Sequence, residues 1–294
     1  MDFKRKILLL GGSSYVGRNI VKAYNSNGVV ATYHSQPIDS GVHFDALSME
    51  LADIVENPSI FSHAFVLLGD TKPDSCAMDP QKSRLLNVVS IERVIDQLND
   101  WGVKPVFFSS EYVFDGQKGN YTELDEPKPV LLYGKQKLEI EKYIQSKCRN
   151  YLIIRLSKTY GSTLGDNTLL TNWMANIQGK SIIKCAADQV FSPVYIDDVV
   201  KSAIRLTEGD FNGIFHVSGN KAFKRIELLE MLLNCIKRRT QLNIRIIPCS
   251  IHDFKSIEKW PLNVSMIPRK LVESTGIMIA NIEDICTEIA ERNF

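Results

Sequence analysis

The sequence KILLLGGSSYVG, residues 6–17, places a short apolar run directly before a glycine-rich turn, and the residues after the turn have helical spacing. This order of strand, turn and helix lets backbone N–H groups and the helix N-terminus face a pyrophosphate. Gly11, Ser14 and Gly17 follow a GxxGxxG pattern in which serine replaces the middle glycine. A glycine-bearing turn in any α/β protein is the alternative, but the position at the first strand favours dinucleotide binding. The candidate cofactor-binding residues are Gly11, Ser13, Ser14, Tyr15, Val16 and Gly17.

Further apolar runs, separated by helical patterns, indicate parallel strands joined by helical crossovers. The predicted strands cover residues 29–33, 43–46, 61–68, 106–108, 151–156 and 213–217, and a later helix is predicted over 168–178. We therefore expect an α/β fold, a doubly wound parallel Rossmann sheet with a smaller C-terminal substrate-binding lobe. The expected NAD(P)-binding domain is 1–156, completed by about 186–218, and the expected lobe is 157–185 with 219–294.

The composition favours a small-molecule enzyme over a nucleic-acid or membrane protein. The 294 residues carry a formal net charge of +1, which argues against a surface for nucleic acid or anionic lipid. No apolar segment is long enough to span a bilayer, and the N-terminal apolar run is too short for a signal peptide. The six cysteines form no CxxC pair and lie near no histidine cluster. We therefore predict a cytoplasmic protein without disulfides and without a metal site.

The residues after the second and third strands bear on the choice of cofactor. An Asp or Glu after the second strand would bind the ribose 2′-OH of NAD, but His34 and Ser35 stand there instead. Both can donate to a phosphate, so NADP(H) is preferred over NAD(H), although a lone His34 is also an ordinary loop residue. Asp45, with Ala46 beside it, is placed to reach an adenine amino group; alternatively it is the N-cap of a helix predicted over 47–55. Leu68, Gly69 and Asp70 follow the next strand and open at the same sheet edge.

The apolar run 106–108 ends in two hydroxyls, where open α/β sheets carry their chemistry. Tyr133 and Lys137 follow at a predicted helix start, four residues apart and therefore on one face. A phenol with a pKa of about 10 is a poor acid at neutral pH, and a nearby ammonium would lower that pKa. Ser110, Tyr133 and Lys137 are thus candidates for carbonyl and alcohol redox chemistry, with Lys137 also able to hold a cofactor ribose. The alternative for the Tyr–Lys pair alone is a surface pair.

Five ordered segments carry a family resemblance. They are the turn at 11–17, FSSEYVFDG at 108–116, YGKQK at 133–137, DQVFSP at 188–193 and WPLNVSM at 260–266. With them the sequence resembles the extended short-chain dehydrogenases/reductases, and most closely the dTDP-4-dehydrorhamnose reductase group of sugar-nucleotide 4-ketoreductases. The segment YVFDG is the most specific match, and the resemblance covers nearly the whole chain.

The resemblance implies that Ser110, Tyr133 and Lys137 are a catalytic triad and that NADPH binds along residues 11–17. It implies reduction of a 4-keto-6-deoxy nucleotide sugar at C4, for cell-surface polysaccharide or glycan precursor synthesis, and a possible homodimer. The expected substrate-binding residues are Ser110, Glu111, Tyr112, Lys158 and Trp260. The alternatives are a non-catalytic NADP-binding regulatory subunit, because the group is similar to the regulatory β subunit of methionine adenosyltransferase, and an NAD(P)-dependent sugar-nucleotide epimerase.

Four positions depart from the relatives that the resemblance suggests. Glu111 and Tyr112 stand where related dehydratases carry an Asp-Glu pair, so elimination chemistry is disfavoured. Lys158 stands where rhamnose-forming reductases tend to carry Trp, and Trp260 where Arg usually precedes Pro. Because both positions are expected to face the substrate, the identity of the sugar stays open. A basic Lys158 is compatible with a more acidic or differently substituted sugar, or with a plain exposed lysine.

Overall fold

A seven-stranded parallel sheet forms the centre of the computed structural model, which describes residues 6–177 and 181–294. Its strands lie in the order β3-β2-β1-β4-β5-β6-β11. The strand order reverses between β1 and β4, which is the switch point where open α/β sheets bind ligands. The predicted doubly wound parallel fold is confirmed. The strands are β1 Lys6–Leu10, β2 Val29–Tyr33, β3 Val42–His43, β4 Phe61–Val66, β5 Lys104–Ser110, β6 Leu152–Leu156 and β11 Gly213–Val217.

Helices cover both faces of the sheet, and this explains why most residues of its strands are apolar. On β1, Leu8 and Leu10 pack toward one layer of helices, whereas Ile7 and Leu9 pack toward the other. The first layer contains α2 Pro73–Met78, α3 Pro80–Arg84, a π-helical turn Leu85–Val89, α4 Ser90–Asp100 and α5 Leu132–Lys147. The second contains α1 Tyr15–Gly28, α7 Ile196–Glu208 and α9 Arg269–Thr275.

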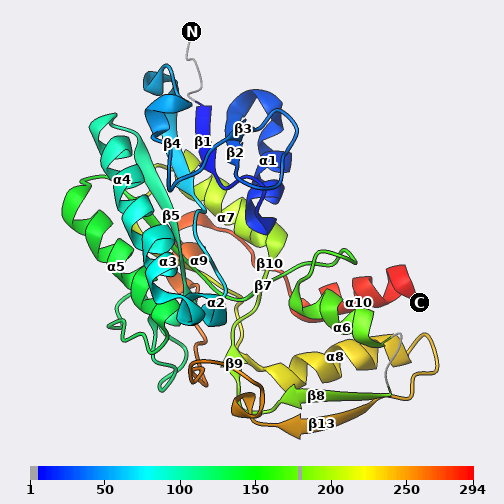
Figure 1. The fold of residues 1–294 in the computed structure, drawn as a ribbon. Coiled ribbons are helices and arrows are strands. Elements are labelled where there is room, and N and C mark those ends of the chain that lie inside the picture. The colour runs from blue at the N-terminus through cyan, green and yellow to red at the C-terminus, as the bar shows by residue number, and fades with distance from the viewer. Residues whose placement is uncertain (1–5, 178–180) are drawn as a thin grey trace.

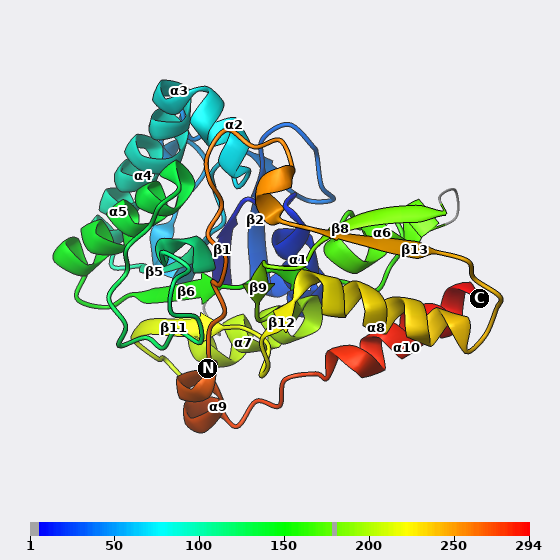
Figure 2. The same ribbon diagram turned by 90° about the horizontal axis from the view of Figure 1, so that it is seen from below.

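A smaller group of elements lies beyond the carboxyl ends of the strands and has its own apolar core (Figures 1 and 2). Trp173, Leu229, Leu232 and Ile289 belong to this core and are buried. The elements are α6 Leu169–Ile177, β8 Ile182–Ala186, α8 Arg225–Lys237, β13 Arg245–Cys249 and α10 Ile282–Asn293. Short strand pairs connect the two parts: β7 Thr159–Tyr160 with β10 Val194–Tyr195, and β9 Val190–Phe191 with β12 Phe223–Lys224. The domain boundaries expected from the sequence stay a prediction.

Some elements differ from the sequence-based expectation. The third strand is Val42–His43 rather than 43–46, and β8 and α9 were not predicted. The helix expected over 47–55 is wrong, because only a short 3-10 helix, Leu51–Asp53, forms there. The helix expected over 168–178 is α6, and its last expected residue, Gln178, lies outside the described residues, as do residues 1–5 of the expected domain.

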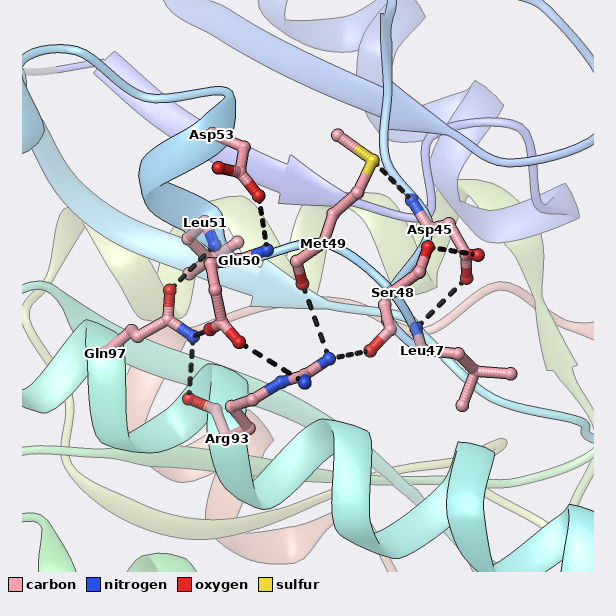
Figure 3. A network of polar contacts seen from close by, with 10 residues as sticks. Asp45, Leu47, Ser48, Met49, Glu50, Leu51, Asp53, Arg93 and Gln97 are labelled. Carbon is pink, nitrogen blue, oxygen red and sulfur yellow. Dashed lines mark hydrogen bonds and ion pairs between the residues drawn. The ribbon is translucent and has the colours of Figure 1, made fainter.

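A polar network replaces the expected helix at 47–55 (Figure 3). Arg93 of α4 donates to the carbonyl of Ala46 at 2.5 Å and forms an ion pair with Glu50 at 3.2 Å. Gln97 accepts from the N–H of Leu51 at 2.7 Å. These contacts satisfy backbone groups that a helix would otherwise pair internally, so the segment runs along α4 as turns.

Among the described residues, no helix is both long and apolar enough to cross a membrane. Within the same residues, no group of three or more His, Cys, Asp or Glu side chains is arranged to hold a metal ion. The six cysteines are free thiols.

Candidate active site

A cleft of about 590 Å³ opens at the carboxyl ends of the strands, between the sheet and the smaller lobe. It brings together seven of the residues singled out from the sequence: Tyr15, Val16, Ser110, Glu111, Tyr112, Tyr133 and Lys158. The lobe contributes Trp173 of α6 and Arg225 of α8 to the opposite wall. The sequence-based site is therefore assembled from the turn after β1, the ends of β5 and β6, and the start of α5.

Ser110 and Tyr133 meet at the base of this cleft. Ser110 ends β5, and its Oγ accepts from the N–H of Tyr112 at 3.3 Å. Tyr133 lies in the first turn of α5 and lines the same cleft as Ser110. The distant Glu258 fixes the start of this helix, because both of its carboxylate oxygens lie 3.0 Å from the N–H of Leu132. A carboxylate suits that position, since the N-terminal end of a helix is electropositive.

Lys137 lies one turn along α5 and is buried beneath Tyr133. Its ammonium donates to the carbonyl of Phe108 at 2.9 Å and lies 5.8 Å from the centre of the Tyr133 ring. Burial lowers the pKa of Lys137 to about 8. Burial also raises the pKa of Tyr133, and the neighbouring Ser110 hydroxyl opposes that shift only in part. The expected lowering of the Tyr133 pKa by Lys137 is therefore not found, because desolvation of the phenolate outweighs the attraction of an ammonium that is itself buried.

A buried ion pair supports the catalytic strand and helix from below. Glu141 of α5 accepts from Arg155 of β6, at 2.7 Å from Nη2 and 3.1 Å from Nε. The same carboxylate accepts from the hydroxyl of Ser109 at 2.5 Å. The side chains of Arg155 and Glu141 are 3% and 1% exposed, so the pair is shielded from water. This contact links β5, β6 and α5 directly beside Ser110.

The segment YVFDG, residues 112–116, packs against this support. The Phe114 ring stacks on Tyr121 with centroids 4.1 Å apart, and the Arg155 guanidinium lies 5.2 Å from its centre. Asp115 accepts from the Tyr121 hydroxyl at 2.5 Å, and this hydrogen bond is the main cause that lowers the pKa of Asp115. Gly116 has φ of +76°, and a Cβ there would lie 2.5 Å from Pro261. Most of this signature therefore serves to hold the loop after Ser110 in place.

Glu111 is the most unusual group in the cleft because it is a carboxyl that is only 2% exposed. It accepts from the Ser157 hydroxyl at 2.5 Å and from the N–H of Lys158 at 3.3 Å. Burial raises its pKa to about 7. Lys158 has an exposed side chain, yet burial and then the charge of Arg225 lower its pKa. Lys158 therefore faces the cleft, whose walls surround its side chain.

Tyr112 and Trp260 continue the cleft toward the lobe. Their rings meet edge to face with centroids 5.4 Å apart, and Tyr112 also contacts the Tyr133 ring at 6.3 Å. Trp260 lines an adjoining pocket of about 280 Å³, which shares Trp173 and Arg225 with the main cleft. Nothing in the sequence distinguished Arg225 or Trp173, since each is one residue of an ordinary helix pattern.

The turn after β1 fits the pyrophosphate of a dinucleotide. Gly11 has φ of +94°, and a Cβ on Gly17 would lie 2.3 Å from the carbonyl oxygen of Gly11. Ser14 is the N-cap of α1 and accepts from the N–H of Gly17 at 3.0 Å, which gives this serine a structural role in place of the family glycine. The N–H groups of Ser13, Tyr15 and Val16 have no backbone acceptor within the described part of the chain. Three free donors at a helix N-terminus suit a phosphate.

The residues proposed for the adenosine end lie outside the cleft, at the edge of the sheet near β2 and β3. His34 and Ser35 are exposed, and His34 Nε2 lies 4.0 Å from Asp45 Oδ1. Asp45 accepts from the N–H of Leu47 at 3.0 Å and from the Ser48 hydroxyl at 2.7 Å (Figure 3). These hydrogen bonds lower the pKa of Asp45, the Ser48 contact most strongly. Asp45 therefore acts as a cap, as the alternative prediction had it, but it caps a turn and not a helix. Ala46 is buried beside it.

Leu68, Gly69 and Asp70 form the loop after β4, and Asn87 holds that loop. Asp70 donates its N–H to Asn87 Oδ1 at 2.7 Å, and Asn87 Nδ2 donates back to the Asp70 carbonyl at 3.0 Å. Gly69 has φ of +118°, and a Cβ there would lie 2.6 Å from Asn87 Oδ1. The loop is therefore fixed by backbone contacts, and it lies between the phosphate-binding turn and the catalytic strand.

Two relatives illustrate what this chain resembles in sequence. The β subunit of methionine adenosyltransferase 2 from Xenopus tropicalis is 27% identical over 247 residues, which cover 76% of this chain and 70% of the relative. The dTDP-4-dehydrorhamnose reductase of Aggregatibacter actinomycetemcomitans is 23% identical over 287 residues, 92% of this chain and 94% of the relative.

Solved structures share the fold over nearly the whole length. The dTDP-4-dehydrorhamnose reductase of Bacillus anthracis, in complex with NADP, has a TM-score of 0.81 at 19% identity and covers 99% of this chain and 100% of that one. MoeE5, in complex with UDP-glucuronic acid and NAD, has a TM-score of 0.80 at 19% identity and covers 98% and 100%.

The family description "RmlD substrate binding domain" matches residues 5–293. The predicted membership of the extended short-chain dehydrogenase/reductase type, as an NAD(P)-dependent oxidoreductase, is confirmed at the level of the family. The identity of the dinucleotide is a separate matter, since the neighbouring structures bind NADP in one case and NAD in another. The chain belongs to the RmlD substrate binding domain family.

Proposed function

We propose that this protein reduces a 4-keto-6-deoxy nucleotide sugar with NADPH, in the synthesis of cell-surface polysaccharide or glycan precursors. The observation that carries the proposal is that Ser110 and Tyr133 line the same cleft, with Lys137 buried directly beneath Tyr133. When bound, the reduced nicotinamide supplies a hydride to the sugar carbonyl. Every other part of the reaction falls to residues of the chain.

Tyr133 is suited to give a proton to the alkoxide that forms at the former carbonyl. Because its pKa is raised, its hydroxyl keeps the proton at neutral pH, as a proton donor must. Ser110 holds the carbonyl oxygen within reach and afterwards donates to the Tyr133 phenolate. Lys137 is 5.8 Å from the Tyr133 ring and stabilises the same negative charge, and it can also hold the ribose.

Binding follows the shape of the cleft. The free N–H groups of Ser13, Tyr15 and Val16 would hold the pyrophosphate of the dinucleotide, and the exposed His34 and Ser35 would favour NADP over NAD. For the sugar nucleotide, we assign Glu111 and Lys158 to the sugar and the Tyr112–Trp260 pair to the nucleotide end. Arg225, between the cleft and the adjoining pocket, adds a second cation opposite Lys158. A homodimer and a cytoplasmic location stay predictions from the sequence.

The test mixes the purified chain with NADPH or NADH and 4-keto-6-deoxy sugars carried on different nucleotides, and follows cofactor absorbance. Replacing Tyr133 by Phe should lower kcat about 10²- to 10⁴-fold and leave dinucleotide affinity unchanged. Tyr143→Phe is the matched control, because Tyr143 lies on the same helix and its hydroxyl binds Asp96 at 2.7 Å, away from the cleft. If no combination of cofactor and nucleotide is consumed, the reductase proposal is wrong.

A second candidate is a non-catalytic, NADP-binding regulatory subunit, favoured by the similarity to the methionine adenosyltransferase subunit. It predicts that the protein co-purifies with a stoichiometric partner whose activity it changes, and that it turns over no keto sugar itself. The third alternative, an epimerase, predicts that bound NAD(P) is released only when the protein is denatured.

A further inference from the structure

Tyr15 makes a contact that its place in the phosphate-binding turn does not require. Its backbone N–H is one of the free donors at the start of α1, while its side chain crosses to the loop 161–168 of the smaller lobe. There its hydroxyl donates to Asp166 Oδ2 at 3.2 Å. Burial and then the charge of Asp166 raise the pKa of Tyr15, so the hydroxyl remains a donor at neutral pH.

Asp166 is built to accept this contact. Its other oxygen, Oδ1, accepts from the N–H of Thr168 at 2.8 Å and from the Thr171 hydroxyl at 2.5 Å, both at the start of α6. One carboxylate oxygen therefore organises the loop and caps the helix, and the other is left for Tyr15.

Gly161 shows how closely the two groups approach. A Cβ on Gly161 would lie 2.0 Å from the Tyr15 hydroxyl oxygen and 2.2 Å from Asp166 Oδ2. The loop thus closes over a position where only glycine leaves room for the hydrogen bond. Gly161 also donates its N–H to Thr168 Oγ1 at 3.0 Å, which ties the two ends of the loop together.

The contact separates two cavities. Tyr15 and Asp166 line both the 590 Å³ cleft and a second pocket of about 420 Å³, which the start of α1 and the loop also line. Breaking the hydrogen bond would let the loop move outward and join the two spaces. Water would then reach the phosphate-binding turn from a second side.

We propose that Tyr15 and Asp166 form a clasp between the lobe and the phosphate-binding turn that retains the bound dinucleotide. Both are positioning residues: Asp166 acts through Tyr15, and Tyr15 holds its own backbone N–H against the phosphate. The clasp rests on dinucleotide binding by the proposed reductase, but it concerns release of the cofactor and leaves the chemical step to Ser110, Tyr133 and Lys137.

The experiment measures the rate of NADPH release from the full-length protein, by the loss of NADPH fluorescence when excess NADP⁺ is added in a stopped-flow instrument. Tyr15→Phe removes only the hydroxyl and should raise the release rate about five- to tenfold, the contribution of one hydrogen bond of ordinary strength. Asp166→Asn removes the acceptor for the phenol proton and should have a similar effect. In the double variant the two effects should not add.

Tyr24→Phe is the matched control. Tyr24 also lies on α1, is partly buried and has one hydroxyl contact, to Thr207 at 3.3 Å, but it faces α7 rather than the cleft. Its release rate should equal that of the unaltered protein. An equal rise in Tyr24→Phe would mean that any loosening of α1 speeds release, and it would overturn the clasp.

The remaining outcomes separate the clasp from the proposed function. Release from Tyr15→Phe and Asp166→Asn at the unaltered rate, in a protein that still oxidises NADPH with a keto sugar, overturns the clasp alone. If Tyr15→Phe does not fold, the NADPH release rate of Asp166→Asn decides between the same outcomes. If the unaltered protein binds neither NADPH nor NADH, both the clasp and the reductase proposal are wrong.

Discussion

The buried pair of Glu141 and Arg155 gives the sharpest prediction about stability. Glu141→Gln leaves the Arg155 guanidinium, 3% exposed, facing a neutral amide. Three donor contacts are weakened at once: two from Arg155 and one from the Ser109 hydroxyl. Removing one partner of a buried pair typically costs about 3–5 kcal/mol, because the remaining charge is left without compensation in a place that water does not reach.

The same helix supplies a control two residues away. Glu139 accepts from both terminal nitrogens of Arg84, at 2.8 and 2.9 Å, so its geometry is as good as that of the buried pair. The side chains of Arg84 and Glu139 are 53% and 39% exposed, however, and exposed pairs contribute about 0–1 kcal/mol. Glu139→Gln should therefore cost at least about 2 kcal/mol less than Glu141→Gln.

Urea unfolding followed by tryptophan fluorescence measures the difference. The midpoint should fall strongly for Glu141→Gln and little for Glu139→Gln, at an unchanged dependence on urea concentration. Activity of the folded Glu141→Gln protein should also fall, because Ser109 lies next to Ser110. Equal midpoints for the two variants would refute the reasoning, since burial is what distinguishes the two pairs.

Two further predictions follow from single residues. Burial raises the pKa of Glu111 from 4.5 to about 7, so between these values the folded protein binds a proton that the unfolded chain does not, and stability falls as pH rises from 4.5 to 7. Relative to Glu111→Gln, the unaltered protein should lose about 3 kcal/mol of unfolding free energy across this window, as measured by urea unfolding at each pH. Parallel plots of unfolding free energy against pH for the two proteins would contradict this prediction. Ser14→Ala removes the N-cap of α1 and should cost about 1 kcal/mol of stability, whereas Ser14→Gly should cost only a few tenths. Thermal unfolding of Ser14→Ala at the unaltered temperature would show that the cap contributes nothing.

The main sheet was predictable because its strands are buried on both faces. In residues 61–68 only Ser62 and His63 are polar, and a mostly apolar run of this kind between helical patterns has few other interpretations. The pieces that escaped prediction depend on distant contacts. Leu51–Asp53 is only a 3-10 turn because Arg93 and Gln97 of another helix bind its backbone and its neighbours. No local pattern contains that information.

The same division holds within the candidate site. The spacing of Tyr133 and Lys137 was enough to place both on one face of α5, and the end of a strand was enough to place Ser110 beside them. The protonation of Tyr133 was not predictable, because the pKa depends on how completely the lobe and the loops exclude water. Arg225 and Glu258 were not predictable either, since each reaches the site from a segment far along the chain.

The lack of space at Gly161 couples three positions that lie far apart in the sequence. A Cβ at position 161 would meet the Tyr15 hydroxyl and Asp166 Oδ2 together, at 2.0 and 2.2 Å, so the hydrogen bond between these two side chains requires glycine there. In a descending lineage, position 161 can therefore diversify only when the contact between positions 15 and 166 is given up. The three positions are constrained together even though none of them belongs to the chemical step.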